Sequence, residues 1–155
     1  MRELSIVEVR VSTPDAPPVV VLREVDGGRL LPIWMSAGGA SAIVSATDDP
    51  DASRPCLHDL VTDLLETLGT RLTEVRIVAY EDGQFYAELV VGDATLSARP
   101  SDALALALRL GCPILCSDKV LDDAGVAEAP DEEPGGEDEV EKFREFLDSV
   151  NPDDF

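Results

Sequence analysis

The sequence predicts an α+β domain in which a unit of three strands and two helices is duplicated. Three observations support this fold class. Several short runs alternate apolar and polar residues, which is typical of strands with one buried face. Other apolar residues recur at spacings of three and four, which is typical of helices. The order of three strands followed by helices occurs twice, before and after Gly69.

The first half contains three predicted strands and a weak helix. Val7, Val9 and Val11 alternate with polar residues, so we expect a first strand with these valines on its buried face. A turn at Asp26-Gly27-Gly28 predicts a hairpin. The second strand, the third strand and a short helix of small residues are expected at 19–25, 30–35 and 36–46.

The most regular helical pattern comes next. Its apolar residues share one face: Leu57, Leu60, Val61, Leu64, Leu65 and Leu68. Gly69 predicts the end of this helix. The three strands of the second half are expected at 75–79, 85–91 and 95–98. A buried helix at 103–108, ended by Gly111, and a short helix at 118–125 complete the expected domain, 1–125.

The last 30 residues have a different composition. Residues 126–139 lack large apolar side chains and are densely acidic, which predicts a disordered linker. Residues 140–155 repeat apolar side chains at helical spacing and predict an amphipathic C-terminal helix. Sliding the sequence by 63 residues places 37–40 over 100–103, so the duplication predicts two helix N-termini in equivalent positions.

The charge of the chain limits its partners. The 155 residues hold 32 acidic and 12 basic side chains, a net charge of −20, and residues 122–155 carry 14 of the acidic ones. Such a field repels phosphate backbones and argues against nonspecific coating of nucleic acid. We expect no membrane span, no secretory signal and a cytoplasmic location, because no apolar run approaches about 20 residues.

The first group of candidate functional residues is Arg54-Pro55-Cys56-Leu57-His58-Asp59, at the opening of the strong helix. It contains the only histidine of the chain. The positive end of the helix favours a neutral imidazole, which can act as a base or a metal ligand. The simpler interpretation, helix capping by Asp59 beside a surface histidine, is favoured by the sequence alone.

The second group is Arg99-Pro100-Ser101-Asp102, again where a strand meets a helix. Capping explains the last three residues. Arg99 fits either a receptor for phosphate or carboxylate, or the ion-pair partner of Asp102. Cys112 and Cys116 lack the further ligands of a zinc site, so buried free thiols are expected. Phosphate-binding loops and serine-hydrolase motifs are absent.

Several strings in the chain resemble the bifunctional nuclease (BFN) domain family, in their order and spacing. They are Leu31-Pro32-Ile33-Trp34, His58-Asp59-Leu60 after Arg54-Pro55, Asp82-Gly83-Gln84-Phe85-Tyr86-Ala87, Ala98-Arg99-Pro100-Ser101-Asp102-Ala103 and Gly111-Cys112-Pro113-Ile114. The resemblance covers about residues 1–125. It implies a duplicated α+β fold, a homodimer, and cleavage of RNA and DNA as in plant members.

By matching motif positions, the resemblance implies a functional surface of Arg54, His58, Asp59, Arg99, Ser101 and Asp102. One departure concerns the opening of the first helix, where the family pattern F-E-A-x-A-I has an acidic residue and this chain has Gly39. If that carboxylate belongs to a metal site in the family, we expect this chain to have lost activity.

Two functional hypotheses follow. In the first, the chain is a metal-dependent nuclease. Asp59 and Asp102 hold Mg²⁺ or Mn²⁺, His58 moves protons, and Arg54, Arg99 and Ser101 bind the substrate. In the second, the chain is a noncatalytic dimeric binding or regulatory module, whose arginines receive an anionic ligand or a partner carboxylate.

Overall fold

The computed structural model describes residues 1–47 and 53–129. Its eight strands form one mixed sheet in the order β6-β5-β4-β7-β1-β2-β3-β8. Their bounds are β1 (Arg2–Arg10), β2 (Val19–Glu24), β3 (Arg29–Trp34), β4 (Leu72–Glu81), β5 (Gln84–Val91), β6 (Ala94–Ala98), β7 (Ile114–Cys116) and β8 (Val126–Ala127). All neighbouring strands are antiparallel except β4 and β7, which are parallel.

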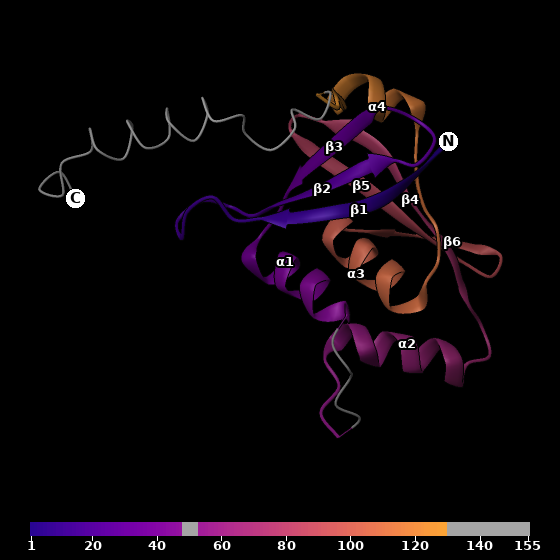
Figure 1. Cartoon of the computed structure of the whole chain (residues 1–155). Helices are drawn as coiled ribbons and strands as arrows, with labels where there is room; N and C mark the ends of the chain where they lie inside the picture. The colour runs from indigo at the N-terminus through magenta and orange to yellow at the C-terminus, as the bar shows by residue number, and fades with distance from the viewer. Residues whose placement is uncertain (48–52, 130–155) are drawn as a thin grey trace, which may run out of the picture.

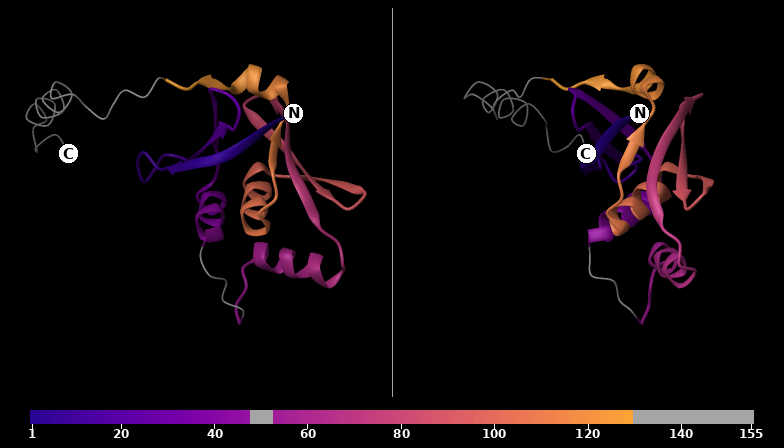
Figure 2. Two further views of the ribbon diagram at one scale, coloured as in Figure 1. Left: turned by 45° about the vertical axis from the view of Figure 1, so that its right-hand side comes forward. Right: turned by 90° about the vertical axis from the view of Figure 1, so that its right-hand side faces the viewer.

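Four α-helices accompany the sheet in the described residues. They are α1 (Ala37–Val44), α2 (Leu57–Thr67), α3 (Pro100–Leu110) and α4 (Asp118–Ala124), and a short 3-10 turn, Ser45–Thr47, follows α1. Figure 1 shows α1, α2 and α3 together below the strands and α4 at the top of the view. Figure 2 shows the strands of the two halves diverging from the region of β7. The architecture is therefore α+β.

Helix α3 is the centre of the core. Ser101 and residues 103–107 are buried, and α3 contacts α1, α2, β4 and β5. Its alanines allow this close packing, because small side chains let neighbouring backbones approach. The predicted buried helix is confirmed, and so is its end, where Gly111 has a φ of 66° that favours glycine.

Strand β1 departs from the predicted pattern. The expectation that Val7, Val9 and Val11 form the buried face is wrong, because Val7 and Val11 are exposed and Leu4 is the buried residue. The physical reason is an irregularity in the pairing with β2 between Ile6 and Glu8. A bulge shifts the alternation by one residue, so side chains before and after it face opposite sides from those a regular strand predicts.

Helix α2 forms where the leucine pattern predicts it and ends before Gly69, whose φ is 67°. Its apolar face is only partly used, since Val61 and Leu65 pack against the core. The other leucines of this face are each more than half exposed: Leu57, Leu60, Leu64 and Leu68. The helix therefore presents a row of exposed leucines, which we call the α2 leucine face.

The predicted duplication agrees with the structure only in its strands. Strands β1–β2–β3 and β4–β5–β6 are both antiparallel and each set precedes a helix. The second helix of each half is placed differently. In the first half, α2 packs on α3, whereas in the second half α4 follows β7 and contacts β3 and β4. Duplication of the whole unit thus stays a prediction.

The end of the body also differs in detail from the expected boundary. Val126 and Ala127, which we assigned to the linker, pair with β3 as β8. The rest of the expected linker from 130 onward and the expected helix at 140–155 lie outside the described residues. In the part of the chain that the structure describes, no helix is long and apolar enough to cross a membrane. The cytoplasmic location stays a prediction.

Candidate functional site

A hydrogen bond joins the openings of α2 and α3. His58, in the first turn of α2, lies with its Nε2 atom 3.0 Å from Oδ1 of Asp102, in the first turn of α3. The His58 side chain is only 16% exposed. The expectation of a simple surface histidine is therefore wrong, because the packing of α2 on α3 carries the imidazole onto the Asp102 carboxylate.

Asp102 also pairs with Arg99. Nε of Arg99 donates to Oδ2 of Asp102 at 2.7 Å, while the Arg99 side chain remains 76% exposed. Partial burial disfavours the charged carboxylate, but the hydrogen bonds from Arg99 and His58 outweigh it, so the pKa of Asp102 lies below its usual value. The ion pair with Asp102 is thus formed through Nε of Arg99, and among the described residues no other ion pair of Arg99 is found, so its other guanidinium nitrogens remain able to bind an anion.

Ser101 lies at the contact between α1 and α3. A Cβ built on Gly39 would lie 2.7 Å from Cβ of Ser101, which is closer than side chains approach. Glycine is therefore what allows the two helix openings to meet here. Ser101 is 7% exposed, and among the described residues no buried polar side-chain atom lacks a hydrogen-bond partner.

Asp59 belongs to a different ion pair. Its Oδ2 accepts hydrogen bonds from the backbone N–H and the thiol of Cys56, and its Oδ1 accepts one from Nε of Arg109 at 2.9 Å. The Cys56 thiol and the Arg109 guanidinium, together with the Cys56 N–H, hold the pKa of Asp59 below its usual value. Asp59 thus caps α2, as the simpler interpretation of the sequence predicts.

Arg109 is the residue of this region that sequence reasoning missed. Its side chain is only 7% exposed, and besides Asp59 it donates to the backbone carbonyls of Ala42 in α1 and Ala105 in α3. It therefore ties three helices together. The signal in the sequence was a single charged residue in the otherwise apolar run 103–110.

Arg54 is not brought to these pairs. It lies exposed in the loop before α2, and none of the ion pairs found among residues 1–47 and 53–129 includes it. Of the six residues that the sequence singles out, the structure joins His58, Asp102 and Arg99 in one contact network, with Ser101 beside them. We call these first three residues the His58 cluster.

The expected metal ligands do not fit a shared ion in this geometry. All four carboxylate oxygens of Asp59 and Asp102 already bind a hydrogen-bonding partner, and the two residues pair with different arginines. Among the described residues, no group of three or more His, Cys, Asp or Glu is arranged to hold a metal ion. Zinc sites commonly use three or more such ligands, whereas Mg²⁺ is usually held by one or two carboxylates, waters and substrate phosphates, so the expected Mg²⁺ or Mn²⁺ stays a prediction.

A cleft of about 640 Å³ opens beside the His58 cluster. Arg99 and Ser101 lie in its wall, together with residues from the end of β3, the β4–β5 hairpin and α4: Pro32, Ile33, Trp34, Met35, Ser36, Tyr80, Gly83, Gln84, Phe85, Pro100, Asp123, Ala124 and Val126. We call it the β3–β5 cleft. Its size lies in the range of small-molecule sites.

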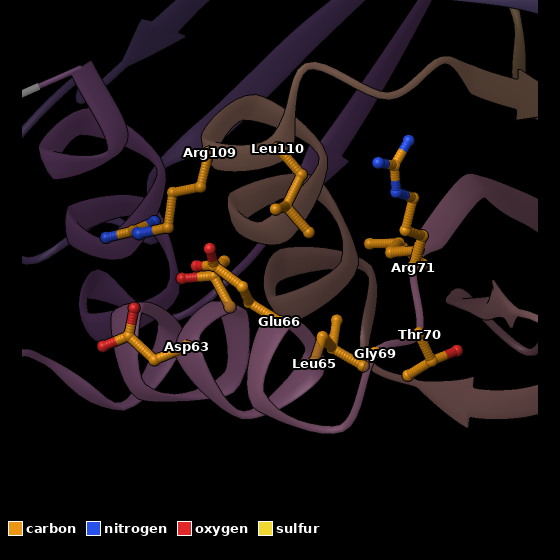
Figure 3. Close-up of a pocket in the computed structure, with 10 residues that line it drawn as sticks. Asp63, Leu65, Glu66, Gly69, Thr70, Arg71, Arg109 and Leu110 are labelled. Carbon is orange, nitrogen blue, oxygen red and sulfur yellow. The ribbon is translucent and has the colours of Figure 1, made fainter.

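A second cavity of about 680 Å³ lies between α2, the start of β4 and the end of α3. Figure 3 shows Asp63, Glu66 and Arg109 on one side of it and Arg71 on the other. The Arg109 guanidinium is already engaged by Asp59 and backbone carbonyls. With two carboxylates in its wall, this cavity suits a phosphate ligand less well than the β3–β5 cleft does.

Comparisons with known proteins identify the family of the chain. The bifunctional nuclease domain matches residues 20–129, which include the His58 cluster and the β3–β5 cleft. An uncharacterized protein of Mycobacterium tuberculosis is 48% identical over 161 residues, covering all of this chain and 98% of the relative.

The plant relatives are more distant and match over a shorter region. Bifunctional nuclease 2 of Arabidopsis thaliana is 31% identical over 103 residues, covering 61% of this chain and 31% of the plant protein. Bifunctional nuclease 2 of rice, Oryza sativa subsp. japonica, is 33% identical over 105 residues, covering 63% and 32%. The domain match spans most of the sheet and all four helices, so the chain belongs to the bifunctional nuclease domain family.

Proposed function

We propose that the chain cleaves phosphodiester bonds in RNA or DNA, with the His58 cluster at the site of cleavage. The supporting observation is the contact network itself, in which an imidazole, a carboxylate and an exposed guanidinium meet, and of which Arg99 lines an open cleft. The name of the family and of its plant relatives supports the same reaction class. An imidazole oriented by a carboxylate is a common arrangement for proton transfer.

Each residue of the cluster has a role in this proposal. In hydrolysis, a water oxygen bonds to phosphorus while the bond from phosphorus to the leaving oxygen breaks, and the leaving oxygen takes up a proton from solvent. His58 would accept the proton of the water through Nδ1, because Nε2 is held by Asp102. Asp102 would orient the imidazole and stabilise its charged form. The free guanidinium nitrogens of Arg99 would bind the nonbridging oxygens of the phosphate.

Dependence of the cleavage on Mg²⁺ or Mn²⁺ stays a prediction. The geometry of Asp59 and Asp102 does not favour it, so no step of the proposed mechanism passes through a metal ion. The direct test is cleavage of labelled single-stranded RNA and DNA by the purified chain in Mg²⁺, in Mn²⁺ and in EDTA. Asp102→Asn is measured beside the parent. Cleavage by the parent that the variant loses, at unchanged stability, supports the proposed site.

A second candidate function is a noncatalytic binding or regulatory module. The observation that favours it is the tight contact between Gly39 and Ser101, which leaves no room at this helix opening for the acidic side chain of the family pattern. The net charge of −20 also disfavours turnover of long polyanions. In the same assay, a folded parent without cleavage in any of the three conditions favours the module.

We also propose that the chain forms a homodimer through the α2 leucine face. The support is the exposure of Leu57, Leu60, Leu64 and Leu68 on a helix whose main contact within the described residues is α3. A twofold axis would place two such helices against each other, and antiparallel helices oppose their dipoles favourably.

A further inference from the structure

The β3–β5 cleft has an aromatic wall that the proposed cleavage does not use. Trp34, at the end of β3, is 61% exposed. The rings of Tyr80 and Phe85, in the β4–β5 hairpin, lie with their centroids 4.5 Å apart. All three residues line the cleft. Exposed aromatic rings beside a cleft are suited to stacking with a planar ligand, as in proteins that bind single-stranded nucleic acids.

The polar groups of the cleft are few and converge near its α3 side. Arg99 is the only cationic side chain among the lining residues, and only its Nε is engaged by Asp102. Ser101 adds a hydroxyl, which is able to donate and to accept hydrogen bonds, from a residue that is 7% exposed. The amide of Gln84 lies in the wall of the hairpin and is able both to donate and to accept hydrogen bonds.

The single carboxylate among the lining residues does not neutralise the positive charge of Arg99. Asp123 lies in the wall formed by α4, and its Oδ2 is paired with Nζ of Lys119. The pair is exposed, so its charge is also screened by solvent. The cleft therefore combines an aromatic surface, one available guanidinium and a hydroxyl in a space large enough for a mononucleotide.

We propose that the β3–β5 cleft is a nucleotide subsite, in which a nucleobase stacks on Trp34 and the phosphate binds the Arg99 guanidinium and the Ser101 hydroxyl. This inference rests on the proposed function for its ligand class, a single-stranded nucleic acid. Because the lining offers a single cation, the subsite takes one phosphate rather than a long backbone. Affinity should then fall with salt by no more than about one order of magnitude for each tenfold rise in concentration.

Trp34 provides the readout, since it is the only tryptophan of the chain. The full chain is titrated with 5′-AMP, with adenosine and with inorganic phosphate while the tryptophan emission is followed. We expect saturable quenching by AMP, with weaker binding of adenosine and of phosphate. Arg99→Gln should weaken AMP binding about tenfold or more, because it removes a charge-assisted contact. Arg71→Gln, in the second cavity, should leave it unchanged.

A second variant tests the stacking. Trp34→Leu, followed by equilibrium dialysis with labelled AMP, should weaken binding about tenfold, as expected for loss of one stacked base. Because Trp34 is exposed, we expect Trp34→Leu to leave the fold intact. Circular dichroism of the variant checks that it is folded.

Three outcomes would overturn the nucleotide subsite. They are no saturable quenching by AMP up to about 10 mM, equal affinity for AMP and phosphate, and unchanged AMP affinity in both variants. The proposed cleavage fails separately. A parent chain that binds AMP as expected and cleaves no RNA or DNA retains the subsite, whereas a parent chain that cleaves RNA or DNA and binds no AMP retains only the nuclease.

Discussion

At the scale of single residues, Asp102 is the group on which the proposed site depends. It receives hydrogen bonds from His58 and Arg99, one from each of two elements, and these hold its pKa below the usual value despite partial burial. A carboxylate with a lowered pKa stabilises the folded state wherever it is charged. The pairing thus links the charge of the site to the stability of the fold.

We predict that Asp102→Asn lowers the free energy of unfolding by about 1 kcal/mol at pH 7. Because the folded-state pKa is depressed, the contribution of Asp102 is complete above the unfolded pKa of about 3.9 and is lost as the pH falls through the lower folded value. In urea denaturation, the difference between parent and variant should therefore be constant from pH 7 to about pH 5 and shrink as the pH falls below about 4.

The control for this pH series is Asp93→Asn, in the exposed turn between β5 and β6, which should match the parent throughout. A difference between parent and Asp102→Asn that stays constant down to pH 3 would contradict the assigned pairing.

The cysteines give a second prediction at this scale. Burial raises the pKa of the Cys116 thiol to about 12, and burial also raises that of Cys112, whereas Cys56 is exposed at the opening of α2. Since the thiolate is the reactive form, iodoacetamide at pH 8 should label Cys56 first and Cys116 only after unfolding. Peptide mass spectrometry measures the order. Equal labelling rates of Cys56 and Cys116 in folded protein would show that the Cys116 environment is wrong.

At the scale of elements, the contact between α1 and α3 depends on the absence of a side chain at Gly39. A methyl group there would meet Ser101 at 2.7 Å, whereas one at Gly38 would have only the Ser36 hydroxyl, 4.0 Å away, within contact range. We predict that Gly39→Ala lowers the free energy of unfolding by about 1–3 kcal/mol through overpacking.

Gly38→Ala is the matched control and should raise the free energy of unfolding by about 0.5–1 kcal/mol, because alanine is the better helix former. Chemical denaturation of the two variants measures both values. Two changes of the same sign and size would mean that α1 and α3 do not meet as the structure places them.

The elements also show what the sequence predicted well. Apolar runs and alternation located β2, β3 and the β4–β5–β6 set, and helical spacing located α2, because those patterns come from local geometry. Helix α3 was predicted from its strong helix formers, since its alternation alone resembles that of a strand. Alternation failed at β1, since a bulge near Val7 depends on pairing with β2 and leaves no local pattern. The sequence also could not predict that the α2 leucine face is exposed, because the spacing of apolar residues identifies an apolar face but not what covers it.

The candidate site was predictable in part for a related reason. Capping residues marked the openings of α2 and α3, so the sequence identified His58 and Asp102 as candidates. Their contact with each other was not predictable, because it depends on the packing of α2 on α3. The role of Arg109 depends on contacts with three helices that are distant in sequence. Arg54 was predicted from its position in the motif, but it does not contact the His58 cluster.

At the scale of the whole molecule, the proposed dimer explains why a helix of this acidic chain exposes a row of leucines. We predict that Leu64→Lys shifts the chain from dimer to monomer, because it places a charge at the centre of the α2 leucine face. Light scattering after size exclusion measures the mass. Leu96→Lys, at an exposed leucine of β6, is the control and should remain dimeric. A monomeric parent would contradict the proposed dimer.

The net charge of −20 also bears on the activity of the whole molecule, because it repels a polyanion everywhere except at a local guanidinium such as that of Arg99. Cleavage, where it occurs, should therefore depend on the few residues of the His58 cluster rather than on a broad basic surface. This dependence is the central claim of the proposed function.

The most direct test compares the rate of cleavage of labelled single-stranded RNA by the parent, by His58→Gln and by Arg71→Gln. All three proteins are prepared identically and checked for equal thermal stability. We predict that His58→Gln reduces the rate about 100-fold or more, as expected for loss of a proton-transfer group, and that Arg71→Gln retains the parental rate. A His58→Gln variant that cleaves at the parental rate would contradict the assignment of the His58 cluster as the site of cleavage.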